Sequence, residues 1–574
     1  MTKFIGGVTG VGSAIVTVLL SLGSGGVARQ AKAEDNSGAR ERGVRTDSMR
    51  PRDGQCHGAN HRARASDRTP PVIRDSNATL NPNAAAPLVA IVMLKTDEPT
   101  RVLLTISDDI RRWRVSSGCL LETSYSVHVF GLRADTSHAI EAVVVDAAGN
   151  KTQAPTMWLT TAPLPADFPP ISVVSDPHRM APGVTFFGVG RWPFFRDPAF
   201  GLIVAVDADG EVVWFYKTSA FAVDGVQRLS NGDLLITDLS LLTGQAAEID
   251  MLGNTVQRWH PRLRPAPDGS TLVNTDTLHH DVIELPNGNF VALSTELRVI
   301  EGFPTLDPAA PTETANVVGD VIVEFERNGS IVREWSLFDI MDIQRLGSYL
   351  SVGPFWNATY GQDTRAWTFA NSIIYVGADD SFVLSLRHQN AVVKISRDSG
   401  QLRWILGDPT GWGPSFQRYL LTPLGDATFP YAQHHPQITD RGTLLLHDNG
   451  NFRAVPPNAA TPAASNFSRA VEYRIHERGM TFEQLWEFGG NQYYSTFLGD
   501  ADRLARNNVL ITFGGQAKTD EGVPSDNILS SQLSAQILEV KRSHTPDIVF
   551  ELTIRDPSTR YTIFRSERLH SIGQ

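Results

Sequence analysis

The sequence has few cysteines and no excess of positive charge. Only two of its 574 residues are cysteine, Cys56 and Cys119, so a disulfide-dense scaffold is excluded. Asp and Glu outnumber Lys and Arg by 62 to 51, and the formal net charge of -11 argues against a nucleic-acid-binding protein. Beyond about residue 27, the chain has no apolar run long enough to span a bilayer.

Three motifs of nucleotide, sulfate-ester and ester chemistry are also missing. There is no G-x-x-x-x-G-K-[ST] loop, which argues against an enzyme that binds a nucleotide sulfate donor. Neither cysteine lies in a Cys-x-Pro-x-Arg run, which argues against a formylglycine-type sulfatase. No Gly-x-Ser-x-Gly elbow is present, so the nucleophile of an α/β-hydrolase is absent.

The N-terminus has the pattern of an export signal. An apolar, glycine-rich run from Phe4 to about Val27 is followed by Ala31-Lys32-Ala33, a small-residue pattern typical of signal peptidase cleavage. We therefore expect a signal peptide over residues 1–33 and a periplasmic or secreted protein, with an uncleaved membrane anchor as the alternative. Residues 34–80 are poor in large apolar side chains, which predicts a disordered tether.

The next segment, residues 81–165, predicts a small antiparallel sandwich of fibronectin-III type. Its apolar runs alternate with a period of two, as in Tyr125-Ser-Val-His-Val-Phe130, and turn residues such as Asp146-Ala-Ala-Gly149 separate them. A proline-rich stretch ends this segment.

From residue 171 to residue 574 one pattern recurs six times. An apolar strand ends in a polar turn, and a second strand follows that carries Trp or another aromatic residue. The copies span residues 202–214, 247–259, 321–335, 392–404, 470–486 and 537–550. Most are preceded by a hairpin with a turn such as Asn-Gly, so each copy offers about four strands. Because so small a unit cannot bury its own sheet face, the copies must stack, which predicts a six-bladed β-propeller.

Polar residues before the first hairpin of three copies are the candidate site. His280 lies eight residues before Gly288, and His434 lies eight residues before Gly442, so the two histidines hold equivalent places in the repeat. We expect them to face one another across the channel. The candidate site further includes His279, Asn371, Arg387 and Phe369.

Several runs in these copies resemble one known family. They are His279-His-Asp-Val-Ile-Glu-Leu-Pro-Asn-Gly-Asn289, Asn371-Ser-Ile373, Asp380-Ser-Phe-Val-Leu-Ser-Leu-Arg-His388, Trp404-Ile-Leu-Gly407, Gln433-His434 and His447-Asp-Asn-Gly450. Together they resemble the bacterial arylsulfate sulfotransferases, which are propeller enzymes with an N-terminal sandwich. The resemblance covers most of the chain after the tether.

The resemblance implies a ping-pong reaction from a phenolic sulfate ester to a phenol acceptor, without a cofactor or metal. It implies that His434 is the nucleophile, carrying the sulfuryl group as a sulfohistidine. Asn371 and Arg387 match residues that hold the sulfuryl oxygens, and His280, or its neighbour His279, matches a further channel histidine. Phe369 stands where the family has another histidine, so we place it against the substrate. The family also implies a homodimer formed through the sandwich.

Two other classes of function remain open. His279-His280 and His434-His435 with Asp281 offer ligands for Zn²⁺ or Ca²⁺ in a lactonase-like propeller hydrolase. Adjacent residues of a strand point to opposite sides, so at most one histidine of each pair would bind the ion. The second alternative is a non-catalytic propeller that binds a glycan or a protein partner.

Overall fold

We describe a computed structural model of the chain, which covers residues 67–193, 200–218, 220–240 and 243–572. The predicted signal peptide and Cys56 lie outside these residues. The described chain divides into two compact units, with their main parts before and after Pro165. No helix in the described ranges has both the length and the apolar character needed to cross a membrane.

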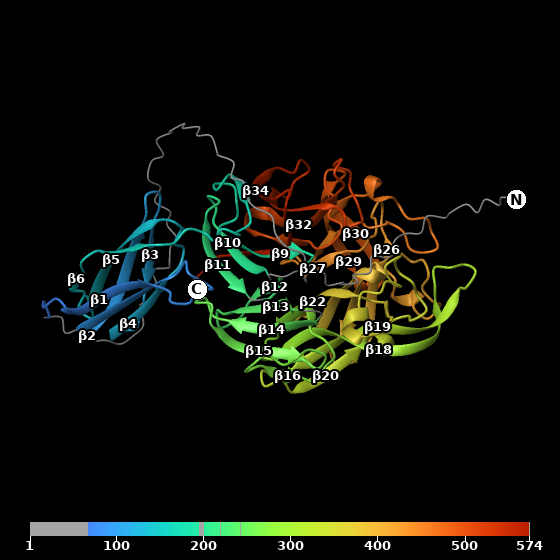
Figure 1. Cartoon of the computed structure of the whole chain (residues 1–574), viewed down its shortest axis with the longest axis horizontal. Coiled ribbons are helices and arrows are strands. Elements are labelled where there is room, and N and C mark those ends of the chain that lie inside the picture. The colour runs from blue at the N-terminus through green and yellow to red at the C-terminus, as the bar shows by residue number, and fades with distance from the viewer. Residues whose placement is uncertain (1–66, 194–199, 219, 241–242, 573–574) are drawn as a thin grey trace, which may run out of the picture. The chain divides into compact units, whose positions relative to one another are not determined.

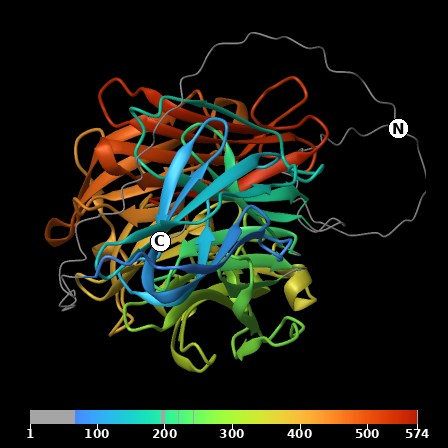
Figure 2. The ribbon, with the colours of Figure 1, turned by 90° about the vertical axis from the view of Figure 1, so that its left-hand side faces the viewer.

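The first unit is built around one long strand, β2, which pairs along its length with four others. Its strands are β1 (Ile73–Leu80), β2 (Ala90–Ser107), β3 (Arg112–Ser116), β4 (Glu122–Val129), β5 (Ser137–Asp146), β6 (Lys151–Gln153) and β7 (Met157–Thr160). The first part of β2 pairs with β1 and β4, and the second part pairs with β3 and β5. The strands of this unit, blue to cyan, can be followed in Figure 2.

Alternating burial explains this sheet arrangement. In β5 the residues His138, Ile140, Ala142 and Val144 are buried, and the residues between them are more exposed. The apolar three, Ile140, Ala142 and Val144, belong to one cluster with side chains of β2 and β4. One boundary predicted from the sequence is wrong, because residues 73–80, which were assigned to the tether, form β1 and pair with β2.

The second unit contains six blades, as predicted, whose four main strands are antiparallel; blades 2, 3 and 5 add one short parallel strand (Figure 1). Blade 1 contains β9 (Val184–Trp192), β10 (Gly201–Val206), β11 (Val212–Thr218) and β35 (Arg560–Leu569); blade 2 contains β12 (Ala222–Arg228), β13 (Leu234–Ser240), β14 (Thr243–Ile249), β15 (Thr255–Pro261) and β16 (Thr271–Val273); blade 3 contains β17 (His279–Glu284), β18 (Phe290–Pro304), β19 (Thr312–Phe325), β20 (Ile331–Ser336) and β21 (Arg365–Ala366). Blade 4 contains β22 (Ala370–Val376), β23 (Ser381–Leu386), β24 (Ala391–Ser396) and β25 (Leu402–Gly407); blade 5 contains β26 (Thr422–Pro423), β27 (His434–Ile438), β28 (Leu444–Asp448), β29 (Ser468–His476) and β30 (Thr481–Gly490); blade 6 contains β31 (Asp500–Arg503), β32 (Asn508–Lys518), β33 (Gln532–Lys541), β34 (Ile548–Arg555) and β8 (Ile171–Ser175).

Short helical turns lie in the connections between the strands. The α-helical turns are α1 (Leu337–Ile340) and α2 (Asn357–Tyr360), and the 3-10 turns are η1 (Arg387–Gln389), η2 (Gln417–Tyr419), η3 (Ala463–Ser465), η4 (Glu477–Gly479) and η5 (Ala505–Asn507). Of these, η1 matters most for the site, because it begins with Arg387.

The six innermost strands are β35, β12, β17, β22, β27 and β31, and neighbours in this order contact one another around a closed ring. Two blades therefore each contain one strand from the opposite end of the propeller sequence. The C-terminal strand β35 pairs with β9 in blade 1, and β8, which precedes blade 1, pairs with β34 in blade 6. This exchange closes the ring.

The recurring tryptophans join neighbouring blades. The indole N–H of Trp214 in blade 1 donates to the carbonyl of Met251 in blade 2, and that of Trp259 in blade 2 donates to the carbonyl of Arg327 in blade 3. Both rings are fully buried. The repeat thus supplies apolar area and one satisfied hydrogen bond at each of these contacts.

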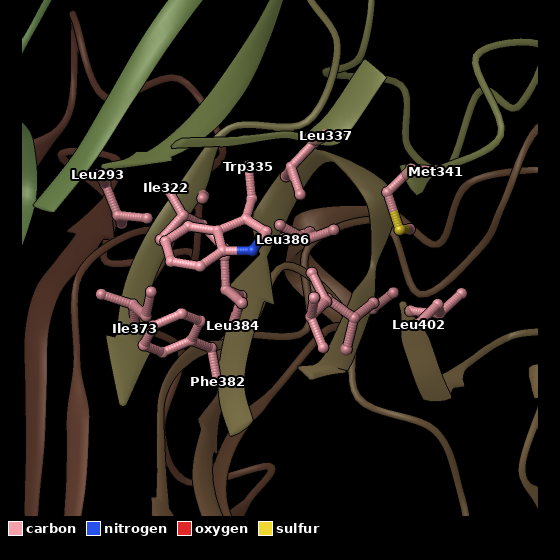
Figure 3. Packing of buried hydrophobic residues seen from close by; sticks show 14 of the residues in the cluster. Leu293, Ile322, Trp335, Leu337, Met341, Ile373, Phe382, Leu384, Leu386 and Leu402 are labelled. Carbon is pink, nitrogen blue, oxygen red and sulfur yellow. The ribbon is translucent and has the colours of Figure 1, made fainter. Parts of the chain in front are cut away.

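Apolar side chains fill the contact between blades 3 and 4. Trp335 of blade 3 packs edge-on against Phe382 of blade 4, with ring centroids 5.3 Å apart (Figure 3). Ile322 and Leu293 from blade 3 and Ile373 and Leu384 from blade 4 belong to the same cluster. Burial of this kind contributes about 25 cal/mol per Å² of apolar surface, which holds rigid the two blades that carry much of the site.

Candidate active site

Irregular backbone marks the start of three innermost strands. The pairing of β17, β22 and β27 with the next strand is interrupted by a β-bulge after His279, Ala370 and His434. His280 and Phe369 have positive φ angles of 54° and 50°, which are uncommon for residues other than glycine. Bulges and positive φ angles redirect side chains and gather at functional sites.

His434 is held in one tautomer by Asn449. Its Nδ1 lies 2.6 Å from the amide oxygen of Asn449, whose amide nitrogen donates to the carbonyls of Ser495 and Leu498, both at 2.8 Å. Because these two bonds fix which end of the Asn449 amide is oxygen, Nδ1 of His434 carries the proton. The lone pair of the neutral ring is therefore at Nε2, for which the described residues supply no hydrogen-bond partner.

The environment of His434 favours its neutral form. The ring is only 4% exposed. Burial lowers its pKa well below the ordinary value of 6.5, and the positive charge of Arg387 lowers it further, against a smaller opposing effect of the Asn449 bond. A neutral imidazole with a free nitrogen lone pair is a nucleophile at neutral pH.

Arg387 provides a positive charge without a carboxylate partner. It begins the turn η1, and its guanidinium donates to the carbonyl of Thr496 at 3.2 Å. Among the described residues, no carboxylate lies within ion-pair distance of it, and burial lowers its pKa to about 10. A largely desolvated guanidinium of this kind is a receptor for an anion.

Asn371 and Arg565 tie blades 3, 4 and 5 to the C-terminal strand. The Asn371 amide donates to the carbonyl of Gln433 at 2.9 Å, next to His434, and its buried Oδ1 has no partner among the described residues. Arg565 on β35 donates to the Asn371 carbonyl and to the Asp281 carboxylate, both at 2.9 Å. Asn371 therefore lies next to His434, with one of its two amide N–H groups already bonded to the main chain.

His279 and His280 contact each other directly. Their Nδ1 atoms lie 2.8 Å apart, and the ring planes are nearly perpendicular. The expectation that adjacent histidines point to opposite sides is wrong here, because the bulge and the positive φ of His280 turn its ring toward His279. Both His280 and His434 pack against the ring of Phe564, at 5.9 and 6.4 Å.

Phe369 belongs to an aromatic wall beside His280. Its ring lies 5.1 Å from that of His280 and stacks on His388 at 4.4 Å with an interplanar angle of 11°. On the other side it contacts Phe355 at 4.4 Å and Trp356 at 5.9 Å. Phe355 is 60% exposed, so the wall offers aromatic surface to solvent next to the histidines.

The metal set proposed from the sequence does not assemble. The Asp281 carboxylate is bonded by Arg565 and by the N–H of Ile373, so its charge and both oxygens are already engaged. His435 instead lies with Asp500 and Asp502, its Nε2 3.5 and 4.0 Å from their carboxylate oxygens. These residues line a separate cavity of about 180 Å³, whose lining does not include His434 or Arg387.

The structure adds four site residues that sequence reasoning missed: Asn449, Phe564, Arg565 and Asp320, whose Oδ1 lies 3.2 Å from Nε2 of His279. Asn449 could have been predicted from the sequence, because it belongs to the run His447–Gly450 that carries the family resemblance. The other three had no sequence signal. Phe564 and Arg565 enter the site only because β35 closes blade 1, and Asp320 lies inside an apolar strand.

The fold and the site define a six-bladed β-propeller whose channel holds a neutral histidine beside an unpaired guanidinium. The chain belongs to the arylsulfotransferase family, because the model of that family (ASST) matches residues 173–565. The model of the arylsulfotransferase Ig-like domain matches residues 77–162. Both matches confirm the resemblance found in the sequence.

Two curated relatives share the family. The chain is 31% identical over 390 residues to arylsulfate sulfotransferase AssT of Escherichia coli O6:H1, an alignment that covers 58% of this chain and 61% of that protein. It is 27% identical over 300 residues to AssT of Lelliottia amnigena, with 44% and 48% covered. The chain therefore matches between about half and three fifths of the length of these relatives. A solved structure of a protein from Lactobacillus plantarum is similar over 82% of this chain and 99% of that one, with 10% identity and a TM-score of 0.30.

Proposed function

We propose that this protein is an arylsulfate sulfotransferase that moves a sulfuryl group from a phenolic sulfate ester to a phenol through His434. Family membership supports the activity. The observation that supports the mechanism is the state of His434, whose Nδ1–H is bonded to Asn449 and whose Nε2 has no hydrogen-bond partner among the described residues.

In the first half-reaction, Nε2 of His434 attacks the sulfur of the donor. The N–S bond forms as the bond between sulfur and the aryl oxygen breaks, and the electron pair of that bond leaves on the phenolate oxygen. A proton from Nε2 of His280 neutralises the phenolate. In the second half-reaction the acceptor phenol gives its proton to His280 and its oxygen attacks sulfur, and the N–S bond returns its electrons to His434.

Arg387 supplies the electrostatic stabilisation. Negative charge spreads over the sulfuryl oxygens during transfer, by analogy with phosphoryl transfer. The unpaired guanidinium can donate to these oxygens, and Asn371 has one further amide N–H beyond the one bonded to Gln433. Preorganised donors of this kind are commonly worth about 3 kcal/mol each in the transition state.

The test is a transfer assay with and without an acceptor. Protein treated with a chelator is incubated with 4-nitrophenyl sulfate, and nitrophenol release is followed before and after phenol is added. We expect acceptor-dependent release that His434→Asn abolishes. The matched control is His435→Asn, which changes the adjacent histidine of the same strand, whose ring faces Asp500 and Asp502 instead.

Three results would contradict the proposal. Equal losses in the two variants would show that the effect comes from the strand and not from Nε2 of His434. Release that needs no acceptor would indicate a hydrolase. Loss of activity on chelation would favour the metal-dependent alternative.

A further inference from the structure

Asp320 is a buried carboxylate with no positively charged side chain to balance it. It lies on β19, is 1% exposed, and makes no ion pair with Lys or Arg in the described part of the chain. One oxygen, Oδ2, accepts from the N–H of Ala370 at 2.8 Å and from the hydroxyl of Thr368. The other, Oδ1, lies 3.2 Å from Nε2 of His279 and accepts no hydrogen bond from any described residue. A buried anion of this kind requires a compensating group.

The surroundings of His279 fix where its proton lies. Its Nε2 is hydrogen-bonded to the carbonyl of Ser294 at 3.2 Å and lies equally close to the Asp320 carboxylate, so the proton is on Nε2. A neutral ring has only one N–H, so Nδ1 of His279 must accept. The group within reach is Nδ1 of His280 at 2.8 Å, which must then donate. This leaves Nε2 of His280 as its reacting nitrogen, without a hydrogen-bond partner among the described residues.

We propose that Asp320 and His279 are positioning residues for His280, and that the chain Asp320–His279–His280 holds Nε2 of His280 as the group that exchanges a proton with the phenols. The inference depends on the proposed sulfuryl transfer, and Asp320 itself touches no substrate. It accepts no proton during the cycle. Its negative charge stabilises the His280 imidazolium through the intervening ring of His279.

The proton count balances over the two half-reactions. The first half-reaction uses the imidazolium form of His280, which loses the Nε2 proton to the departing aryl oxygen and is left neutral. His280 enters the second as a neutral base, takes the proton of the acceptor phenol at Nε2, and returns to the imidazolium. In both steps Nδ1–H of His280 stays bonded to His279.

The other charged groups near His280 oppose this protonation. Burial lowers its pKa well below 6.5, and His279, His434, Arg565 and Arg387 lower it further in that order. Asp281 does not offset them at His280, because its carboxylate is bonded to Arg565. The Tyr360 hydroxyl is bonded to Thr295, and burial raises the pKa of Tyr360, so this group stays neutral. The Asp320 carboxylate is therefore the anion left to favour the imidazolium.

The test compares donors whose phenols differ in acidity. Asp320→Asn keeps an oxygen for Ala370 and Thr368, and presents an amide N–H to His279 in place of a carboxylate oxygen. We expect kcat/KM to fall at least about tenfold more for phenyl sulfate than for 4-nitrophenyl sulfate, because the nitrophenolate needs less help from an acid. The basic limb of the pH profile with phenyl sulfate should move to lower pH.

A second variant separates positioning from folding. His279→Gln removes the middle of the chain, and the double variant with Asp320→Asn should lose no more than either single variant. Equal losses for both donors, or losses that multiply in the double variant, would overturn the proposal. If the wild type transfers no sulfuryl group, the proposed function fails instead. The imidazole nitrogen resonances of ¹⁵N-labelled histidine then test the relay alone, and it fails if Asp320→Asn leaves the His280 tautomer unchanged.

Discussion

Arg387 offers a test in which stability and activity should change in opposite directions. Replacing it by Met keeps the length and apolar character of the side chain and removes the charge. Burial lowers the pKa of Arg387 from its ordinary value to about 10, which corresponds to about 3 kcal/mol against the charged form in the folded protein. The variant also loses the hydrogen bond to the carbonyl of Thr496, worth about 1 kcal/mol.

The net expectation for Arg387→Met is a gain of about 2 kcal/mol in the free energy of unfolding, with loss of sulfuryl transfer. For a unit of about 400 residues, this gain raises the midpoint of the propeller transition by about 2 °C. Differential scanning calorimetry measures the shift, and the assay with 4-nitrophenyl sulfate measures the activity.

Added sulfate supplies the internal control. An anion present at about 100 times its dissociation constant stabilises the protein it binds by about 2.7 kcal/mol. Sulfate should therefore raise the midpoint of the wild type more than the midpoint of Arg387→Met. Sulfate also stabilises proteins by exclusion from their surfaces, and this effect is common to both proteins. If Arg387→Met is less stable than the wild type, or if both proteins respond equally to sulfate, then Arg387 is not a destabilising, anion-binding charge.

Two further predictions concern Phe369 and His447. Phe369→His should fold well, because histidine adopts a positive φ more readily than phenylalanine, and we expect transfer from phenyl sulfate to rise about tenfold relative to 4-nitrophenyl sulfate; an unchanged ratio would exclude a role for a histidine here. Burial lowers the pKa of His447 to about 4, and neither of its ring nitrogens has a partner among the described residues. Above pH 6.5 the ring is neutral in the folded and the unfolded state, and on acidification the unfolded state takes up the proton first, which destabilises the folded protein. In urea unfolding, the free energy of unfolding of His447→Leu relative to that of the wild type should therefore grow by about 2 kcal/mol between pH 7.5 and 5; a constant difference would contradict this prediction.

The blades could be predicted from the sequence because their signals are local. Each turn is set by its own residues, such as Asn287-Gly288, and each recurring Trp makes its contact within two neighbouring blades. Strand β35 lacks such a signal. Its partner β9 lies more than 350 residues earlier, and only the closed ring brings them together.

The candidate site was predicted in outline, and its hydrogen bonds were not. Repeat spacing placed His280 and His434 correctly at the starts of innermost strands. The contact between His279 and His280 depends on a bulge, and a bulge follows from the pairing of two strands and not from either strand alone. Asp320 could not be predicted for a related reason: its neighbour His279 lies on β17, and its hydrogen bonds reach the start of β22.

The closing strand explains why the site requires the whole ring. Phe564 packs against His280 of blade 3 and His434 of blade 5, and Arg565 joins Asp281 of blade 3 to the main chain of Asn371 in blade 4. Neither residue lies near these partners in the sequence. Because catalytic groups must be held within about 0.5 Å of their working positions, a strand that contacts three blades at once restrains the two histidines more than any one blade can. The last strand of the chain therefore both closes the fold and positions the two histidines.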